Sequence, residues 1–170
     1  MKSPLLTLAV VLSLVFIRGN AAAADVEKLG AFSFQPAPQL SIKREIPGFK
    51  LPFFFAPPKD GFAPNLNFVE EALVGEWNGY VTASIDGIKN GLKAEILEPA
   101  ASFELASKLP CQRFVYRHTR TGKDIRAICF LIHLQPQQAL IATFSALSAD
   151  GDRWDSAAAE SIRTVAALPK

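Results

Sequence analysis

Two cysteines and two histidines are the residues of this sequence whose side chains could do nucleophilic or metal chemistry: Cys111, Cys129, His118 and His133. A thiolate beside a histidine base could attack a carbonyl carbon, and histidines are common metal ligands. Neither pattern is complete. No third residue that would orient a base is recognisable, and the histidines lack the four-residue spacing of a helical metal pair. We therefore expect no catalytic residue, no metal site and no cofactor.

The two cysteines flank a predicted β-hairpin with its loop at Thr121–Asp124. In an exported protein such a pair is most often a disulfide, which here would be worth about 3 kcal/mol in the chain-entropy account. A loop centred near residue 120 would place Cys111 and Cys129 opposite each other, and a centre near 121 or 122 would leave them diagonal or offset. We expect the disulfide, and two buried free thiols are the alternative.

The same hairpin carries a concentration of positive charge. Between residues 111 and 126, five basic side chains and the single acid Asp124 give a local charge of +4. Such clusters are usually solvated strand faces that prevent edge-to-edge pairing, but arginine also suits carboxylate and phosphate ligands. The candidate patch for an anion or an acidic partner consists of Arg113, Arg117, Arg120, Lys123 and Arg126.

A sheet and two helices must position these residues. Apolar residues at helical spacing predict a helix over Trp77–Leu92, stopped by Asn90 and Gly91. A second helix is expected after Asp152, which could cap it while Asp155 suits its positive end. The predicted strands are Phe32–Phe34, Gln39–Ile46, Leu51–Ala56, Asn65–Glu71, Lys93–Leu97, Ser102–Leu105, Gln112–His118, Ile125–Leu134 and Ala139–Ser145.

A segment rich in phenylalanine and proline precedes the first helix. Its prolines keep strands short or at sheet edges. Most of its aromatic rings should lie in the core, and any exposed part would mark a site for a protein partner. The candidate apolar partner surface consists of Phe53, Phe54, Phe55 and Phe62, with Phe49 beside them.

The first 24 residues have the pattern of a secretory signal peptide. Lys2 supplies a positive charge, Leu5–Ile17 is an apolar run of 13 residues, and small residues precede a cut after Ala24. The run is shorter than the roughly 20 residues that span a bilayer. We expect a periplasmic or secreted protein with no stable membrane anchor, in which residues 25–170 form a single domain.

Composition limits the function further. The chain is 49% apolar and has 18 basic and 16 acidic side chains. Because Lys2 and Arg18 are the basic residues of the signal peptide, the mature domain has a net charge of zero. It therefore lacks the bulk positive charge that favours nucleic acid binding.

Three segments resemble the PsbP-like superfamily: FAPNLNFVEE at Phe62–Glu71, GYVTASIDGIK at Gly79–Lys89 and RFVYRHTRTGK at Arg113–Lys123. The superfamily includes an extrinsic photosystem II subunit, a Ran-binding import factor and bacterial exported proteins. The resemblance implies an α+β fold, an α/β/α sandwich with a central, mostly antiparallel sheet. It also implies a module without catalysis that binds a protein partner. The metal-associated residues of the photosystem member have no match in this chain.

The leading hypothesis is an exported, periplasmic, non-catalytic binding or accessory protein that engages a protein partner through its sheet or loop surface. The alternative is a protein that binds a small anionic ligand on the basic hairpin. A hydrolase is the third hypothesis, and it would need His118 or His133 beside a carboxylate in a pocket.

Overall fold

A computed structural model describes residues 25–169, so the expected signal peptide lies outside the described residues. The chain forms a seven-stranded sheet of order β3-β4-β5-β9-β8-β7-β6 in which every pairing is antiparallel. Its strands are β3 (Ile42–Arg44), β4 (Phe53–Phe55), β5 (Asn65–Ala72), β6 (Glu95–Ser102), β7 (Cys111–Arg120), β8 (Lys123–Gln135) and β9 (Gln138–Leu147). A smaller antiparallel sheet joins β1 (Glu27–Leu29), β2 (Phe32–Phe34) and β10 (Ala166–Ala167) in the order β1-β2-β10.

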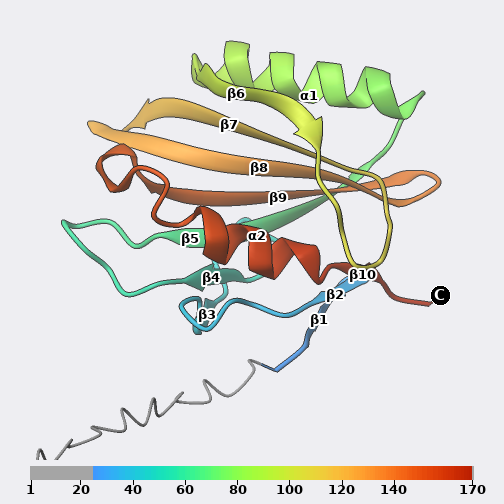
Figure 1. Cartoon of the computed structure of the whole chain (residues 1–170), viewed down its shortest axis with the longest axis horizontal. Helices are drawn as coiled ribbons and strands as arrows, with labels where there is room; N and C mark the ends of the chain where they lie inside the picture. Colours follow the sequence, from blue (N-terminus) through green and yellow to red (C-terminus); the bar gives the residue numbers. More distant parts are fainter. Residues whose placement is uncertain (1–24, 170) are drawn as a thin grey trace, which may run out of the picture.

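The two helices lie on opposite faces of the large sheet. In Figure 1, α1 (Trp77–Leu92) runs along the top of the molecule, with α2 (Asp155–Arg163) and the small sheet lower down. A short 3-10 helix, η1 (Ser148–Asp150), precedes α2. Each face has its own apolar cluster. Ala158 and Ile162 of α2 belong to one cluster, and Val81 of α1 belongs to the other. The expected α/β/α sandwich is confirmed.

Helix α1 forms where its apolar spacing predicted it. Val81 is buried, and Ile85 and Ile88 pack against the same cluster. The predicted stop at Gly91 is wrong, because the left-handed residue that closes the helix is Lys93, with φ at 50°. The next amide, that of Ala94, returns a 3.1 Å hydrogen bond to the Lys89 carbonyl oxygen.

Helix α2 begins without the predicted aspartate cap. Its N-cap residue is Trp154, which makes no side-chain capping bond. Asp155 occupies the first turn, as predicted, where a negative charge is favourable. Its carboxylate also bonds two arginines of the sheet, so tertiary contacts hold this end of the helix.

Strand β6 corrects a second prediction. The sequence predicts two strands separated by Pro99, but one strand runs from Glu95 to Ser102. It is an edge strand, and its pairing with β7 shifts register between Ile96 and Glu98 and again between Glu98 and Ala101. A proline can occupy an edge strand at such irregularities because no ladder hydrogen bond from its nitrogen is required.

The β7–β8 hairpin separates the two cysteines, so the expected disulfide is wrong. Both thiols are free and buried. Thr121 and Gly122 form a two-residue turn with φ values of 49° and 74°, which centres the hairpin between them. Cys111 consequently pairs with Ile132, and Cys129 with Phe114. Because the two positions are offset by three residues, the cysteines face opposite sides of the sheet and enter different apolar clusters.

Candidate functional site

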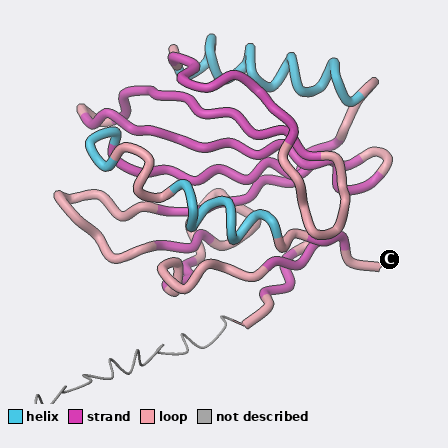
Figure 2. The backbone as a smooth tube through the Cα atoms, viewed as in Figure 1, coloured by secondary structure: helices cyan, strands magenta, loops and turns pink. Residues whose placement is uncertain are grey.

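An open cleft of about 680 Å³ lies on the α1 face of the large sheet, beyond the C-terminal end of that helix. Gly91 and Leu92 of α1 form part of its rim. The helix covers the apolar cluster around Phe114 and Cys129, but the part of this face nearer the β7–β8 turn contributes to the cleft instead. The opposite side of the cleft is lined by residues of the segment between residues 35 and 64, which is mostly loop, drawn pink in Figure 2.

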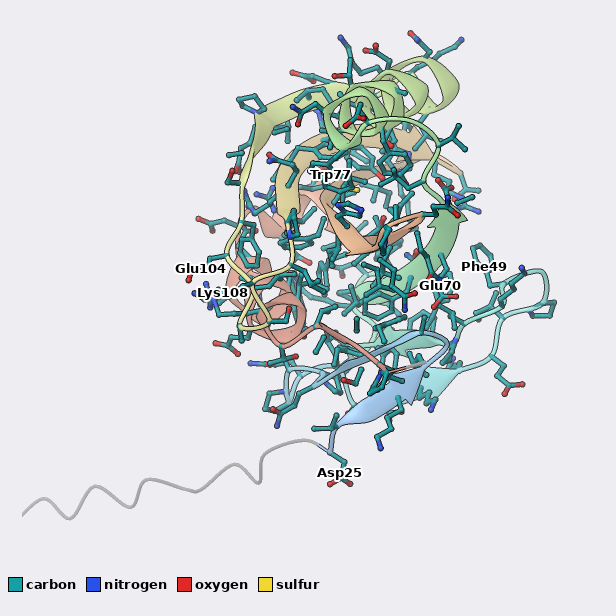
Figure 3. All side chains as sticks on the ribbon, turned by 90° about the vertical axis from the view of Figure 1, so that its right-hand side faces the viewer. Asp25, Phe49, Glu70, Trp77, Glu104 and Lys108 are labelled. Carbon is teal, nitrogen blue, oxygen red and sulfur yellow. The ribbon has the colours of Figure 1, made fainter. Side chains whose placement is uncertain are left out.

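One wall of the cleft is aromatic. Phe49, Phe53, Phe55 and Phe62 line it. The ring centroids of Phe53 and Phe55 are 6.1 Å apart in a stacked arrangement, and Phe49 meets Phe53 edge to face at 4.7 Å. Figure 3 shows Phe49 on a loop that stands out from the body of the molecule. Three of the four residues of the predicted apolar surface therefore lie together.

The fourth residue of that predicted surface, Phe54, is a core residue. Alternation along β4 directs it to the other face of the sheet, where it is 1% exposed. Its ring meets Phe34 at 4.9 Å and Phe68 at 6.4 Å. The run of three phenylalanines thus serves two purposes, the central ring in the core and its two neighbours at the cleft.

The other wall comes from the β7–β8 turn and is basic. Arg120, Lys123 and His118 line it. Lys123 Nζ donates a 3.0 Å hydrogen bond to the backbone carbonyl oxygen of Asp60, which ties the turn to the loop that carries Phe62. Among residues 25–169, no acidic side chain is ion-paired with Arg120.

Polar residues of β5 and β9 line the cleft between these walls. Asn65 pairs with Ser145 across the strands, and Asn67 pairs with Thr143. Asn67 Nδ2 donates a 3.2 Å hydrogen bond to the Thr143 carbonyl oxygen. Asn65, Asn67, Thr143 and Ser145 were not among the site residues predicted from the sequence. The alternation of Asn65 and Asn67 with Leu66 and Phe68 was the available signal, because it predicts one polar face on an otherwise buried strand.

The predicted basic patch is divided between the two faces of the hairpin. Arg113 and Arg126 lie on the α2 face, where both bond the Asp155 carboxylate, at 2.9 Å and 2.6 Å, and also Glu98. Arg117 faces the same way and pairs with Glu95 at 2.5 Å. Acidic side chains compensate the charges of these three arginines. Of the predicted patch, Arg120 and Lys123 line the cleft.

The two cysteines and the two histidines are not brought together in the fold. Burial raises the pKa of each cysteine thiol to about 12, and the reactive thiolate is correspondingly disfavoured. His133 stacks on Trp77 at 5.3 Å beside α1, whereas His118 lies near the turn at the other end of the hairpin. Burial first, and the Arg120 charge second, lower the pKa of His118.

Within residues 25–169, no group of three or more histidine, cysteine or acidic side chains is arranged to hold a metal ion. Neither helix in this range has the length and apolar character needed to cross a bilayer.

Comparisons with known proteins bear on the fold. No family model matches the sequence, and no curated protein matches it either. Among solved structures, cyanobacterial PsbP (CyanoP) from Synechocystis sp. PCC 6803 superposes with a TM-score of 0.60 and 10% identity, over 88% of this chain and 96% of that one. LpqN, involved in cell envelope biogenesis of Mycobacterium tuberculosis, gives 0.55 and 11%, over 89% and 88% respectively.

A third similar structure is PA94 from Pseudomonas aeruginosa, a protein of unknown function. It superposes with a TM-score of 0.56 and 15% identity, over 76% of this chain and 98% of that one. At these identities the likenesses speak for the fold. The chain therefore has a PsbP-like fold, and its function has to be sought in its own surface.

Proposed function

We propose that this chain is an exported, non-catalytic binding protein whose ligand site is the cleft on the α1 face. The observation that carries the proposal is the convergence of aromatic residues of the 46–62 segment and basic residues of the β7–β8 turn on one open cleft of about 680 Å³. Small-molecule sites commonly measure about 300–1,000 Å³ and combine apolar walls with a few polar groups. The cleft has both properties.

The make-up of the cleft supports binding without catalysis. Among the residues that the structure describes, neither a cysteine nor an acid lines the cleft, so His118 has no carboxylate of this part of the chain beside it there to act as an orienting partner. The two buried thiols are held in their protonated form. Export is supported by the signal-peptide pattern of residues 1–24, which has a charged start, an apolar run and small residues before the cut.

A protein partner is a second candidate for the occupant of the cleft. Phe49 is 50% exposed and Leu92 is 46% exposed, and they stand on the rim of the same cleft. Large exposed apolar side chains gathered at one place commonly mark protein interfaces. A segment of a partner that inserts a side chain would then use the same walls as a small ligand.

The neutral fluorescent probe N-phenyl-1-naphthylamine tests the proposal with mature protein. We expect saturable binding at one site, which Ser145→Trp weakens at least tenfold because the indole fills the cleft. Phe55→Ala, which removes part of the aromatic wall, is the second cleft variant. Ala83→Trp adds the same indole to the exposed side of α1 and serves as the matched control.

The folded state of each variant is checked by circular dichroism before titration. Absence of saturable binding by the unaltered protein, both of this probe and of its anionic counterpart 8-anilinonaphthalene-1-sulfonate, would overturn the proposal. Equal binding by the unaltered protein and by both cleft variants would do the same, since the probe would then be sitting elsewhere.

A further inference from the structure

We propose that the cleft is built for an organic anion with an apolar body, its anionic group at Arg120 and Lys123 and its body against Phe53 and Phe55. This inference rests on the proposed function and names the chemical class of the ligand. It commits to a free small molecule, and an acidic peptide is left to the test.

Acidic side chains compensate only part of the positive charge on the β7–β8 hairpin. Of the five basic side chains on the hairpin, Arg113, Arg117 and Arg126 are ion-paired with acids on the opposite face. Lys123 bonds a neutral backbone carbonyl, and Arg120 is ion-paired with no acid among the described residues. The cleft therefore contains two cationic groups whose charge no carboxylate of the described chain neutralises.

Within residues 25–169, no aspartate and no glutamate lines the cleft, where its carboxylate would repel an anion. Asp124, the one acid on the turn, accepts a 2.8 Å hydrogen bond from the Thr119 hydroxyl and does not line the cleft. Clefts lined by one sign of charge raise the local concentration of oppositely charged ligands, so this one favours anions.

The Lys123 side chain links the basic wall of the cleft to the loop that carries Phe62. The Lys123 ammonium is held by the Asp60 carbonyl and lies 3.6 Å from where a side chain on Gly61 would begin. This contact brings the β7–β8 turn to the loop that carries Phe62. The basic wall is thus fixed relative to the aromatic wall, and one ligand can reach both.

The aromatic wall of the cleft suits the apolar body of the proposed ligand. Phe53 and Phe55 are half-buried and stacked, and Phe49 closes edge-on against Phe53. Such rings accept aromatic or aliphatic groups, with aromatic pairs worth about 0.5–1.5 kcal/mol beyond the area they bury. A purely inorganic anion would leave this wall unused, and a purely apolar ligand would leave two cations without counter-charge.

A pair of fluorescent probes separates these possibilities. The anionic probe is 8-anilinonaphthalene-1-sulfonate, and the neutral one is N-phenyl-1-naphthylamine, which has the same ring systems without the sulfonate. With the mature protein at low salt, we expect the anionic probe to bind at least tenfold more tightly. We expect its affinity to fall as sodium chloride is added, because salt screens exposed charges.

Substitutions identify the residues responsible. Arg120→Gln should weaken the anionic probe about tenfold, as loss of a charge-assisted contact does, and should change the neutral probe less than twofold. Lys123→Gln is the second test of the basic wall. Arg117→Gln is the matched control, since it removes an arginine of the same strand from the opposite face and should change neither affinity.

The outcomes distinguish the inference from the function on which it rests. Equal affinity for both probes, or an anionic affinity unchanged in both Arg120→Gln and Lys123→Gln, would overturn the anionic class while the cleft remains a binding site. No saturable binding of either probe would overturn the proposed function itself. Displacement of the anionic probe by an acidic peptide but by no fatty or aromatic carboxylate would overturn the small-molecule assignment.

Discussion

Cys111 and Cys129 lie on opposite faces of the seven-stranded sheet, although they belong to the two strands of one hairpin. Cys111 is 4% exposed and Cys129 is fully buried. A disulfide joins side chains that point toward each other across about 4 Å between Cβ atoms. Bridging this pair would require the strand register to change, which would move every apolar residue of a strand to the wrong face.

The first prediction is therefore that purified protein, kept free of reductant, contains two free thiols. Ellman's reagent should titrate two thiols per chain in denaturant and should react slowly with the native protein. The slow native reaction follows because burial raises the thiol pKa to about 12 and excludes the reagent. Fewer than two thiols in the denatured chain would contradict the hairpin register.

A second prediction separates two adjacent phenylalanines. Phe54→Ala should lower the free energy of unfolding by about 3–5 kcal/mol, because it leaves a cavity among buried aromatic rings. Phe55→Ala should cost clearly less, because that ring is half-buried at the cleft, and it should weaken binding of N-phenyl-1-naphthylamine. Urea unfolding and probe titration measure the two effects. Equal losses of stability would contradict the assignment of the two rings to opposite faces.

A third prediction concerns the contact between α2 and the sheet. Asp155→Asn should lower the free energy of unfolding by about 1–3 kcal/mol, because it removes the negative charge and one of the two oxygens that accept hydrogen bonds from Arg113 and Arg126. Glu98 still pairs with both arginines, which limits the loss. The control is Glu95→Gln, whose exposed pair with Arg117 should contribute at most about 1 kcal/mol. A loss no larger than the control's would show that Asp155 does not anchor the helix.

A fourth prediction follows from His118. Its pKa lies below the ordinary histidine value because of burial and, second, the Arg120 charge. Arg120→Gln should therefore raise the pKa of His118, as followed by NMR of the imidazole protons, whereas Arg117→Gln should leave it unchanged. A saturating anionic probe should also raise this pKa, since it brings negative charge into the cleft. An unchanged His118 pKa in Arg120→Gln would contradict the prediction, because it would show that the Arg120 charge does not act on the imidazole.

The same shift has a consequence for stability. The unfolded chain binds a proton at His118 more readily than the native chain does, since the native pKa is the lower one. Acidification from about pH 6.5, the unfolded value, down through the native pKa of His118 should therefore reduce its contribution to stability. His118→Gln should remove this part of the pH dependence measured by urea unfolding.

Much of the architecture could be read from the chain because its signals are local. The alternation in Asn65–Glu71 predicted one central strand, the turn at residues 135–138 preceded a second at Ala139–Ser145, and the apolar spacing from Trp77 predicted α1. Departures occurred where local rules compete with tertiary contacts. Lys93 rather than Gly91 closes α1, and Pro99 lies inside an edge strand.

The candidate site could be read only in part. The sequence identified the phenylalanines and the basic residues as two separate groups, without assigning them to faces. Since side chains alternate across a strand, face depends on register, and register here follows from the turn at Thr121 and Gly122. Alternation along β7 places Arg120 on the α1 side and Arg113 on the α2 side, and the turn sets Lys123 opposite Arg120.

Residue types and their spacing were thus enough to predict an α+β chain with a mostly antiparallel sheet, and the structure confirms this fold class. Residue types and spacing did not determine which side chains meet in space. Strand pairing brings residues 49–62 beside residues 118–123, and it places the two cysteines apart. The physical reason is that composition and periodicity act over a few neighbouring residues, whereas the cleft is formed by segments about 60 positions apart in the chain, brought together only when the sheet assembles.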